Sequence, residues 1–398
     1  MALSKKLLLL LLLIFFHNAA AESLLDAKHI AGNLQLFTYA IGDEDPASEG
    51  AYATSIGGIL GYRYRWKNNF GVNLDYAGSN ALGPSINAAR LHLFNNDTHS
   101  IHLNTLARAN IFYANKTSVA RIGYQTLDTP LFNEDKTRIV PWGTESFTLS
   151  HIHENRVRTY LSIINRIRSN TSEVYKKESA SGAIDSGLYI VAATYQPDDY
   201  HSLETYLYIA PDLYNSFYTQ YQNNHPITDD IYLGFGIQYL KTFASGDSRN
   251  ANINGINGGQ DADVIATRVS FDYHDLETSL AYSQNFGQSG INKGYGGLTK
   301  LYTTSMVANG RKNFKPESWM LKADYQFTIN EYGTSDIAIW LLNTQHHNTL
   351  GNDFTSYYTH LRHFLNVDTS LYIRYEYIDY EEALTDTDYL RIIMKYTF

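Results

Sequence analysis

The end of the chain, LRIIMKYTF, alternates apolar and polar side chains up to an aromatic C-terminus. Its apolar face carries Leu390, Ile392, Met394, Tyr396 and Phe398. Its other face carries Arg391, Lys395 and Thr397, because successive side chains of a strand point to opposite sides. This period is typical of a barrel strand between lipid and water. The alternative, a strand of a soluble sandwich, is disfavoured since the pattern recurs many times along the chain.

The first 21 residues have the pattern of a signal peptide. Lys5 and Lys6 precede an apolar run at residues 7–16, and alanines at residues 19–21 offer a cleavage site. That run is too short to span a bilayer as a helix, which needs about 20 residues. We therefore expect residues 1–21 to be removed after export and residues 22–398 to form one domain. Any membrane insertion must then be as a barrel.

The composition suits an exported barrel. The 33 tyrosines and 18 phenylalanines, against 8 prolines, fit many strands with aromatic residues at both membrane interfaces. The chain has no cysteine, so backbone ladders and packing must hold the exported protein together. The formal charge of -9 leaves open a preference for cations if carboxylates line the mouth of a pore.

Alternating segments recur between short turns and long polar insertions. Nineteen can be counted, but an odd number cannot bring both chain ends to the same side of the membrane. The short turns at residues 115–117, 198–201 and 366–368 all lie on the same side of the membrane only if the segment 87–95 is a loop and not a strand. The expected strands are 30–40, 54–66, 70–77, 102–114, 118–126, 145–152, 156–168, 187–196, 201–210, 215–223, 229–243, 262–273, 276–286, 317–328, 334–346, 352–364, 369–380 and 388–398.

The predicted fold is therefore all-β: a transmembrane antiparallel β-barrel of about 18 strands. Barrels of about 16 to 18 strands leave an aqueous channel, whereas about 8 strands are filled by side chains. Short turns are expected on the periplasmic side and long loops outside. The insertions at residues 244–262 and 287–316, rich in Gly, Asn and Ser, are expected to be extracellular loops.

A selective pore needs a segment that narrows it. Residues 127–144, LDTPLFNEDKTRIVPWGT, form a long early loop with prolines near both ends. Its concentrated charges are Glu134, Asp135, Lys136 and Arg138. We expect this constriction loop to fold into the lumen. The alternative is an ordinary exposed loop of mixed charge.

Arginines at even positions of the expected strand 156–168 suggest a basic wall. Arg156, Arg158, Arg166 and Arg168 should project to the same side, with apolar residues such as Leu161 facing lipid. Asn165 on the lipid face is an imperfection that suggests a bulge or a strand end. By the same parity Arg121 and Arg108 face the lumen. Such a cationic track could guide anionic groups. Alternatively, each arginine is paired with a lumen carboxylate that stiffens the wall.

Residues 120–147, ARIGYQTLDTPLFNEDKTRIVPWGTESF, resemble the OprD family of outer-membrane porins around its constriction loop. The resemblance includes an arginine-glycine strand, a TP pair and a proline before an aromatic-ended strand. Weaker similarity covers residues 211–213, 301–310, 318–327 and the C-terminal run. After Val140 the chain reads PWGTE, where family members more often have Thr-Phe-Glu-Gly following the proline.

The resemblance implies an 18-stranded channel for small water-soluble nutrients that bear a carboxylate, such as amino acids, small peptides and organic acids. It places the basic ladder on Arg156, Arg158, Arg166 and Arg168, and the constriction on Asp135 and Arg138. It implies a Gram-negative outer membrane as the location, membrane lipid and small solutes as partners, and no cofactor. Whether the barrel works alone or as a homotrimer is left open.

Two other classes of outer-membrane protein are alternatives. An outer-membrane hydrolase would need Ser, His and carboxylate groups, and His346, His347, His360 and His363 lie near Ser356 in two neighbouring strands. No strained nucleophile motif accompanies them, and the adjacent pair His346 and His347 points to opposite faces, which disfavours a shared metal. An adhesin or structural barrel is the third class. No P-loop, zinc-ligand spacing or nucleic-acid signature is present, so we expect a channel rather than an enzyme.

Overall fold

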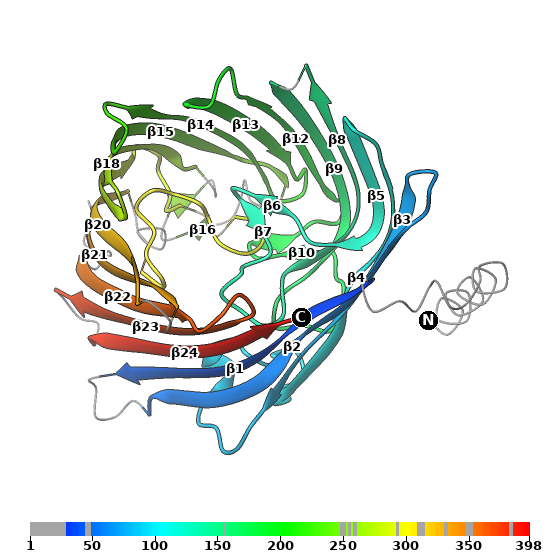
Figure 1. Ribbon diagram of the computed structural model, residues 1–398, viewed down its shortest axis with the longest axis horizontal. Helices are drawn as coiled ribbons and strands as arrows, with labels where there is room; N and C mark the ends of the chain where they lie inside the picture. The colour runs from blue at the N-terminus through cyan, green and yellow to red at the C-terminus, as the bar shows by residue number, and fades with distance from the viewer. Residues whose placement is uncertain are drawn as a thin grey trace.

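The computed structural model describes residues 29–43, 49–154, 156–246, 252–253, 256–257, 261–291, 294–308, 315–329, 333–346, 353–381 and 385–398. The signal peptide predicted at residues 1–21 lies outside these ranges. Eighteen strands form one closed antiparallel sheet around a central lumen (Figure 1). Within the described ranges, no helix is long and apolar enough to cross a membrane.

The barrel strands follow one another around the ring in chain order. They are β1 (Ile30–Asp43), β2 (Ala51–Arg65), β3 (Phe70–Ala81), β4 (His102–Ala114), β5 (Ser118–Gln125), β8 (Gly143–His153), β9 (Val157–Arg168), β12 (Leu188–Tyr195), β13 (His201–Ile209), β14 (Tyr214–Pro226), β15 (Ile231–Ala244), β18 (Asp263–Tyr273), β19 (Leu276–Asn285), β20 (Pro316–Thr328), β21 (Thr334–His346), β22 (Phe354–Phe364), β23 (Thr369–Tyr380) and β24 (Thr387–Thr397). Because β1 pairs with both β2 and β24, the sheet has no free edge. The predicted barrel and its strand number are confirmed.

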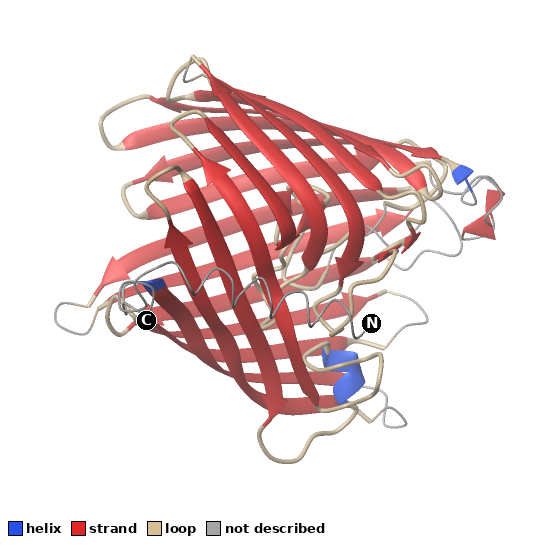
Figure 2. Cartoon of the chain, turned by 90° about the vertical axis from the view of Figure 1, so that its right-hand side faces the viewer, coloured by secondary structure: helices blue, strands red, loops and turns tan. Residues whose placement is uncertain are grey.

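The segment 87–95, which the phase of the turns excluded from the barrel, contains the short 3-10 helix η2 (Ala88–Leu91). Among the described loop residues, three two-stranded hairpins are formed. They are β6 (Asp128–Thr129) with β7 (Phe132–Asn133), β10 (Glu178–Ser179) with β11 (Gly182–Ala183), and β16 (Asn252–Ile253) with β17 (Ile256–Asn257). The strands cross the wall obliquely, as closure of a large barrel requires (Figure 2).

The alternation read from the sequence separates the two faces of the wall. In β24, Ile392 and Met394 are exposed on the outer face, while Arg391 is only 2% exposed on the lumen side. Arg391 is buried because chain segments fill part of the lumen. A water-filled interior alone would have left it exposed.

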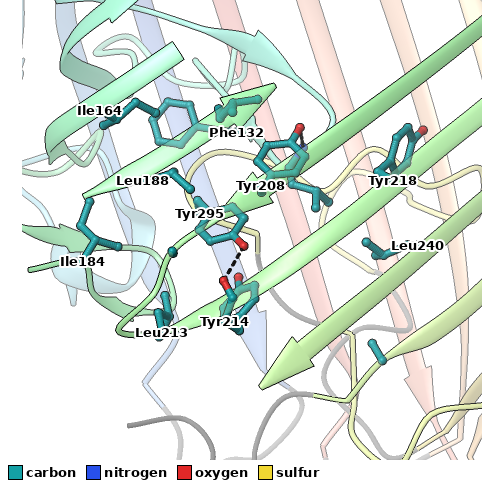
Figure 3. Packing of buried hydrophobic residues seen from close by; sticks show 14 of the residues in the cluster. Phe132, Ile164, Ile184, Leu188, Tyr208, Leu213, Tyr214, Tyr218, Leu240 and Tyr295 are labelled. Atoms are coloured by element: carbon teal, nitrogen blue, oxygen red, sulfur yellow. Dashed lines mark hydrogen bonds between the residues drawn. The ribbon is translucent and has the colours of Figure 1, made fainter. Parts of the chain in front are cut away.

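Three clusters of buried apolar residues lie where loop segments pack against the inner wall. One joins Phe132 and Tyr295 to β9 and β12 to β15 (Figure 3). The second joins Ile139 and Val140 to β1 to β4, and the third joins Tyr302 to β18 and β20 to β23. The loops are therefore held on several sides of the lumen.

Candidate functional site

The first inner loop, residues 126–142 between β5 and β8, crosses the lumen. Its hairpin of β6 and β7 places Phe132 in the cluster with Tyr208 and Tyr295. Further along, Ile139 and Val140 pack against the wall formed by β1 to β4. Two apolar anchors on different walls thus hold the loop inside, as predicted for residues 127–144.

A second inner loop, residues 294–308 between β19 and β20, runs beside the first. Three backbone hydrogen bonds join them: Asn133 N to Gly296 O at 3.0 Å, Tyr295 N to Leu131 O at 2.8 Å, and Lys300 N to Pro130 O at 3.0 Å. The Lys300 ammonium also pairs with the Asp128 carboxylate at 2.6 Å. Residues 287–316 connect β19 and β20 on the same side of the barrel as the first inner loop, but the inward fold of residues 294–308 was not predicted. The sequence signal for this inward fold is the apolar content of the loop, because Tyr295, Leu301 and Tyr302 are all buried in the structure.

The hydroxyl of Tyr295 links the second inner loop to the wall. It donates a hydrogen bond to the carbonyl oxygen of Tyr214 at 2.9 Å (Figure 3). Burial raises the pKa of Tyr295 well above its usual value, and the nearby Tyr214 adds to this effect. The hydroxyl therefore stays neutral and available as a donor.

Glu376 on β23 anchors the other end of the second inner loop. The buried carboxylate accepts hydrogen bonds from the backbone N–H groups of Val307 at 2.5 Å and Ala308 at 3.3 Å. Ser356 donates a third at 2.6 Å. These hydrogen bonds compensate the burial of the charge.

Arg108, predicted for the basic track, faces the lumen but is paired. Its guanidinium contacts Asp75 at 2.8 Å and Glu134 at 3.3 Å. Lys136 also lies 3.8 Å from Glu134 and is largely exposed. Arg108 thus bridges the wall and the first inner loop, in line with the alternative that lumen arginines stiffen the structure.

Asp135 and Arg138, predicted for the constriction, lie on the first inner loop. Asp135 is buried, with a φ of 53°, and its carboxylate accepts hydrogen bonds from Thr137 and Asn170. Arg138 is half-buried, and its guanidinium carbon lies 5.4 Å from the centre of the Tyr39 ring. Asp135 therefore shapes the loop rather than facing open solvent.

Arg121 and Arg158 are the two arginines of the predicted track that line the lumen without an ion-pair partner in the described chain. Both line a lumen cavity of about 270 Å³ beside the first inner loop, together with Tyr160 and Tyr206. In the described part of the chain, neither forms an ion pair with a carboxylate. Arg156 precedes β9 in an exposed turn and lies outside this cavity.

The prediction that four arginines share one face is wrong beyond Ile164. The pairing register of β8 and β9 shifts there, because Glu145 is opposite Arg166 while Ser146 is opposite Ile164. Asn165 is the extra residue of this bulge, and a bulge reverses the alternation that follows it. Arg166 therefore lies on the outer face beside Glu145, 3.6 Å away.

Arg168 also lies away from the lumen track. It is completely buried at the end of β9, and its guanidinium donates to the carbonyl oxygens of Pro141, Ser169 and Ser172. The guanidinium carbon of Arg168 lies 5.6 Å from the centre of the Tyr175 ring, and that ring stacks on the ring of Tyr124. Arg168 thus supports the loops around the pore.

In the described part of the chain, no three His, Asp or Glu side chains gather as a metal site would require. His360 instead contacts Asp336 and Tyr358, each at 3.0 Å, and His346 pairs with Asp353. His347 lies outside the described residues. His363 lies 2.8 Å from the Ser335 hydroxyl, so each described histidine of the predicted cluster has a polar partner.

A closed barrel with an apolar outer face, a polar lumen and loops folded inward defines an outer-membrane porin. Residues 86–348 match the sequence model of the outer membrane porin, OprD family. The chain belongs to this family. No curated protein sequence matches the chain.

Solved structures of porins from Acinetobacter baumannii and Pseudomonas aeruginosa have the same fold. OccAB1 of Acinetobacter baumannii has 15% identity and a TM-score of 0.79, covering 93% of this chain and 96% of its own. OccK9 (OpdG) of Pseudomonas aeruginosa has 14% identity and a TM-score of 0.81, covering 93% and 97%. OpdK of Pseudomonas aeruginosa, solved with vanillate, has 15% identity and a TM-score of 0.78, covering 93% and 99%.

Proposed function

We propose that this porin allows passive, selective diffusion of small water-soluble nutrients that bear a carboxylate, such as amino acids, small peptides or organic acids. The observation that carries the proposal is the pair Arg121 and Arg158, which line one lumen cavity without a carboxylate partner in the described chain. Asp128 is the acidic residue of that lining, and Lys300 offsets its charge at 2.6 Å. The cavity therefore carries excess positive charge.

Arginine suits this role because its guanidinium stays charged and its planar fork matches a carboxylate. Arg121 also lines a second cavity of about 450 Å³, together with Arg63 and Arg108. Both of those arginines pair with Asp75. A carboxylate can therefore exchange between neighbouring cations through weak contacts, which favours passage over tight binding.

The two inner loops supply the narrowing that selectivity requires. They are joined by backbone hydrogen bonds, and their apolar anchors fix them to the wall. Passage needs neither energy input nor a cofactor under this proposal, and the chain acts as a channel rather than an enzyme.

We further propose that the barrel lies in the outer membrane of a Gram-negative bacterium after export through a signal peptide at residues 1–21. Exposed apolar residues of the outer strand faces then contact lipid. The structure of OpdK with vanillate supports a carboxylate as the solute class. Cross-linking in native membranes decides between a monomer and a homotrimer.

The test is the reversal potential of the purified mature protein in a planar bilayer under a salt gradient. We expect an anion-selective channel whose current is blocked by small carboxylates more than by basic amino acids. Replacing Arg121 and Arg158 together by Gln should move the reversal potential toward cation preference. Arg166→Gln, on the outer face, is the matched control and should leave selectivity unchanged.

Two outcomes would overturn the proposal. A silent barrel would favour an adhesin or structural role. An open channel whose ion preference is the same in the folded Arg121 and Arg158 double variant would exclude these two residues as the selective element.

A further inference from the structure

Two arginines are directly opposite each other on neighbouring strands. Arg374 of β23 pairs in register with Arg391 of β24, and both side chains face the lumen side. They are only 7% and 2% exposed. Like charges placed directly opposite in a sheet are destabilising, and burial increases the cost.

A third arginine reaches the same place from the first inner loop. The guanidinium carbon of Arg391 lies 4.5 Å from the centre of the Tyr39 ring, and that of Arg138 lies 5.4 Å from the same centre. Arg391 therefore has Arg138 beside the same ring and Arg374 opposite it in the sheet. Arg374 itself donates through Nε to the hydroxyl of Tyr358 at 2.9 Å, with its guanidinium carbon 5.4 Å from the centre of that ring. The loop and the wall therefore meet through Arg138 and Arg391.

Several donors at this meeting point have no acceptor. Arg391 uses Nη2 to donate to the Tyr39 hydroxyl at 3.0 Å. Its Nε and Nη1, together with Nε of Arg138, are buried without a hydrogen-bond partner among the described residues. A buried charged donor left without an acceptor destabilises the fold.

The nearby carboxylates are engaged elsewhere. Glu376, two positions along β23 from Arg374, is held by Ser356 and by the backbone of the second inner loop. Asp135, three positions before Arg138, accepts from Thr137 and Asn170. In the described chain, no ion pair offsets any of the three arginines, so a counter-charge must come from outside it.

We propose that a small inorganic anion of the halide class is bound between Arg138 and Arg391 and holds the first inner loop against the wall. Water could accept the free N–H groups but would leave the positive charges uncompensated. The burial of Arg391 favours a resident ion over a passing solute. The inference does not depend on the proposed solute class and can fail while carboxylate selectivity is upheld.

The first experiment compares amide hydrogen exchange across residues 135–140 of the folded barrel in chloride and in gluconate at equal ionic strength. We expect exchange at least several-fold slower in chloride, because gluconate is too large for an occluded site. Arg391→Gln should remove the difference, and Arg391→Lys, which keeps the charge, should retain part of it. Arg158→Gln, in the open cavity, should keep the full chloride effect.

A second experiment locates the ion and separates halide from carboxylate. Crystals of the wild-type barrel soaked in bromide should give an anomalous peak beside Arg391 that persists when acetate is added. A site filled by acetate but not by bromide would overturn the proposal in favour of a station for solute carboxylates. Absence of both the peak and the chloride effect, or a chloride effect that survives in folded Arg391→Gln, would also overturn it.

Discussion

The guanidinium of Arg168 donates a hydrogen bond to the carbonyl oxygen of Pro141 across 2.6 Å. This contact joins the end of β9 to the point where the first inner loop returns to the wall. The same group donates to Ser169 and Ser172, each at 3.1 Å. One buried cation thus organises two loops beside the pore.

Arg168→Ala should loosen the first inner loop without opening the barrel. The substitution leaves three carbonyl oxygens without their donor, and each buried unsatisfied group costs about 1–3 kcal/mol. We expect a noisier channel of higher conductance and a lower unfolding temperature, measured by single-channel recording and thermal denaturation. Arg168→Lys should restore part of the stability. Conductance noise equal to that of the wild type in Arg168→Ala would contradict this role.

Glu376→Ala should release the second inner loop at Val307 and Ala308. The buried carboxylate accepts from both backbone amides, and hydrogen bonds to a charged group contribute about 1.5–3 kcal/mol each. Hydrogen exchange across residues 303–308 should rise, while exchange in the barrel strands stays slow. Glu317→Gln, on the outer side of β20, is the control and should leave this loop protected. Unchanged exchange in Glu376→Ala would exclude the anchor.

Local sequence was sufficient to predict the strands because lipid and water impose a period of two on each of them. The largest difference at a strand end is four residues, at β3, which was predicted to end at 77 and ends at Ala81. Turn phase also excluded the segment 87–95 from the barrel. These features depend on neighbours in the sequence, so a single chain reveals them.

The positions of the site residues depend on features that the alternation of side chains along a strand does not reveal. A single unpaired residue, Asn165, turns Arg166 to the outer face, although the sequence beyond it still alternates. The sequence marks Asn165 as an imperfection of the lipid-facing side, but counting parity across it assigns Arg166 to the wrong face. The pairing of Asn133 with Gly296 joins two loops far apart in the chain, and local patterns carry no information on such contacts.

Asp128→Asn and Lys300→Gln should move ion selectivity in opposite directions. The two side chains form a half-exposed pair at 2.6 Å beside the cavity of Arg121 and Arg158, so either change alters the lumen charge by one unit. Such exposed pairs contribute at most about 1 kcal/mol, so stability should change little. Reversal potentials should show stronger anion preference in Asp128→Asn and weaker preference in Lys300→Gln. Shifts of the same sign in both variants would contradict an electrostatic cause.

Lowering the pH should weaken the contact between the loop after β3 and the loop after β9. Partial burial opposes ionisation, but hydrogen bonds from Lys176 and Ser172 hold the pKa of Asp97 below its usual value of 3.8. A carboxyl group with a lowered pKa in the folded state stabilises the fold above its unfolded pKa, and this contribution is lost as the pH falls through the lowered value. The Asn96 amide donates to the Thr171 carbonyl at 3.0 Å. Its protection from hydrogen exchange should therefore decrease in the wild type when the pH drops below about 4, whereas Asp97→Asn should show no such decrease. Asp97→Asn removes the titrating group, so equal pH dependence in both proteins would assign the change to another carboxylate.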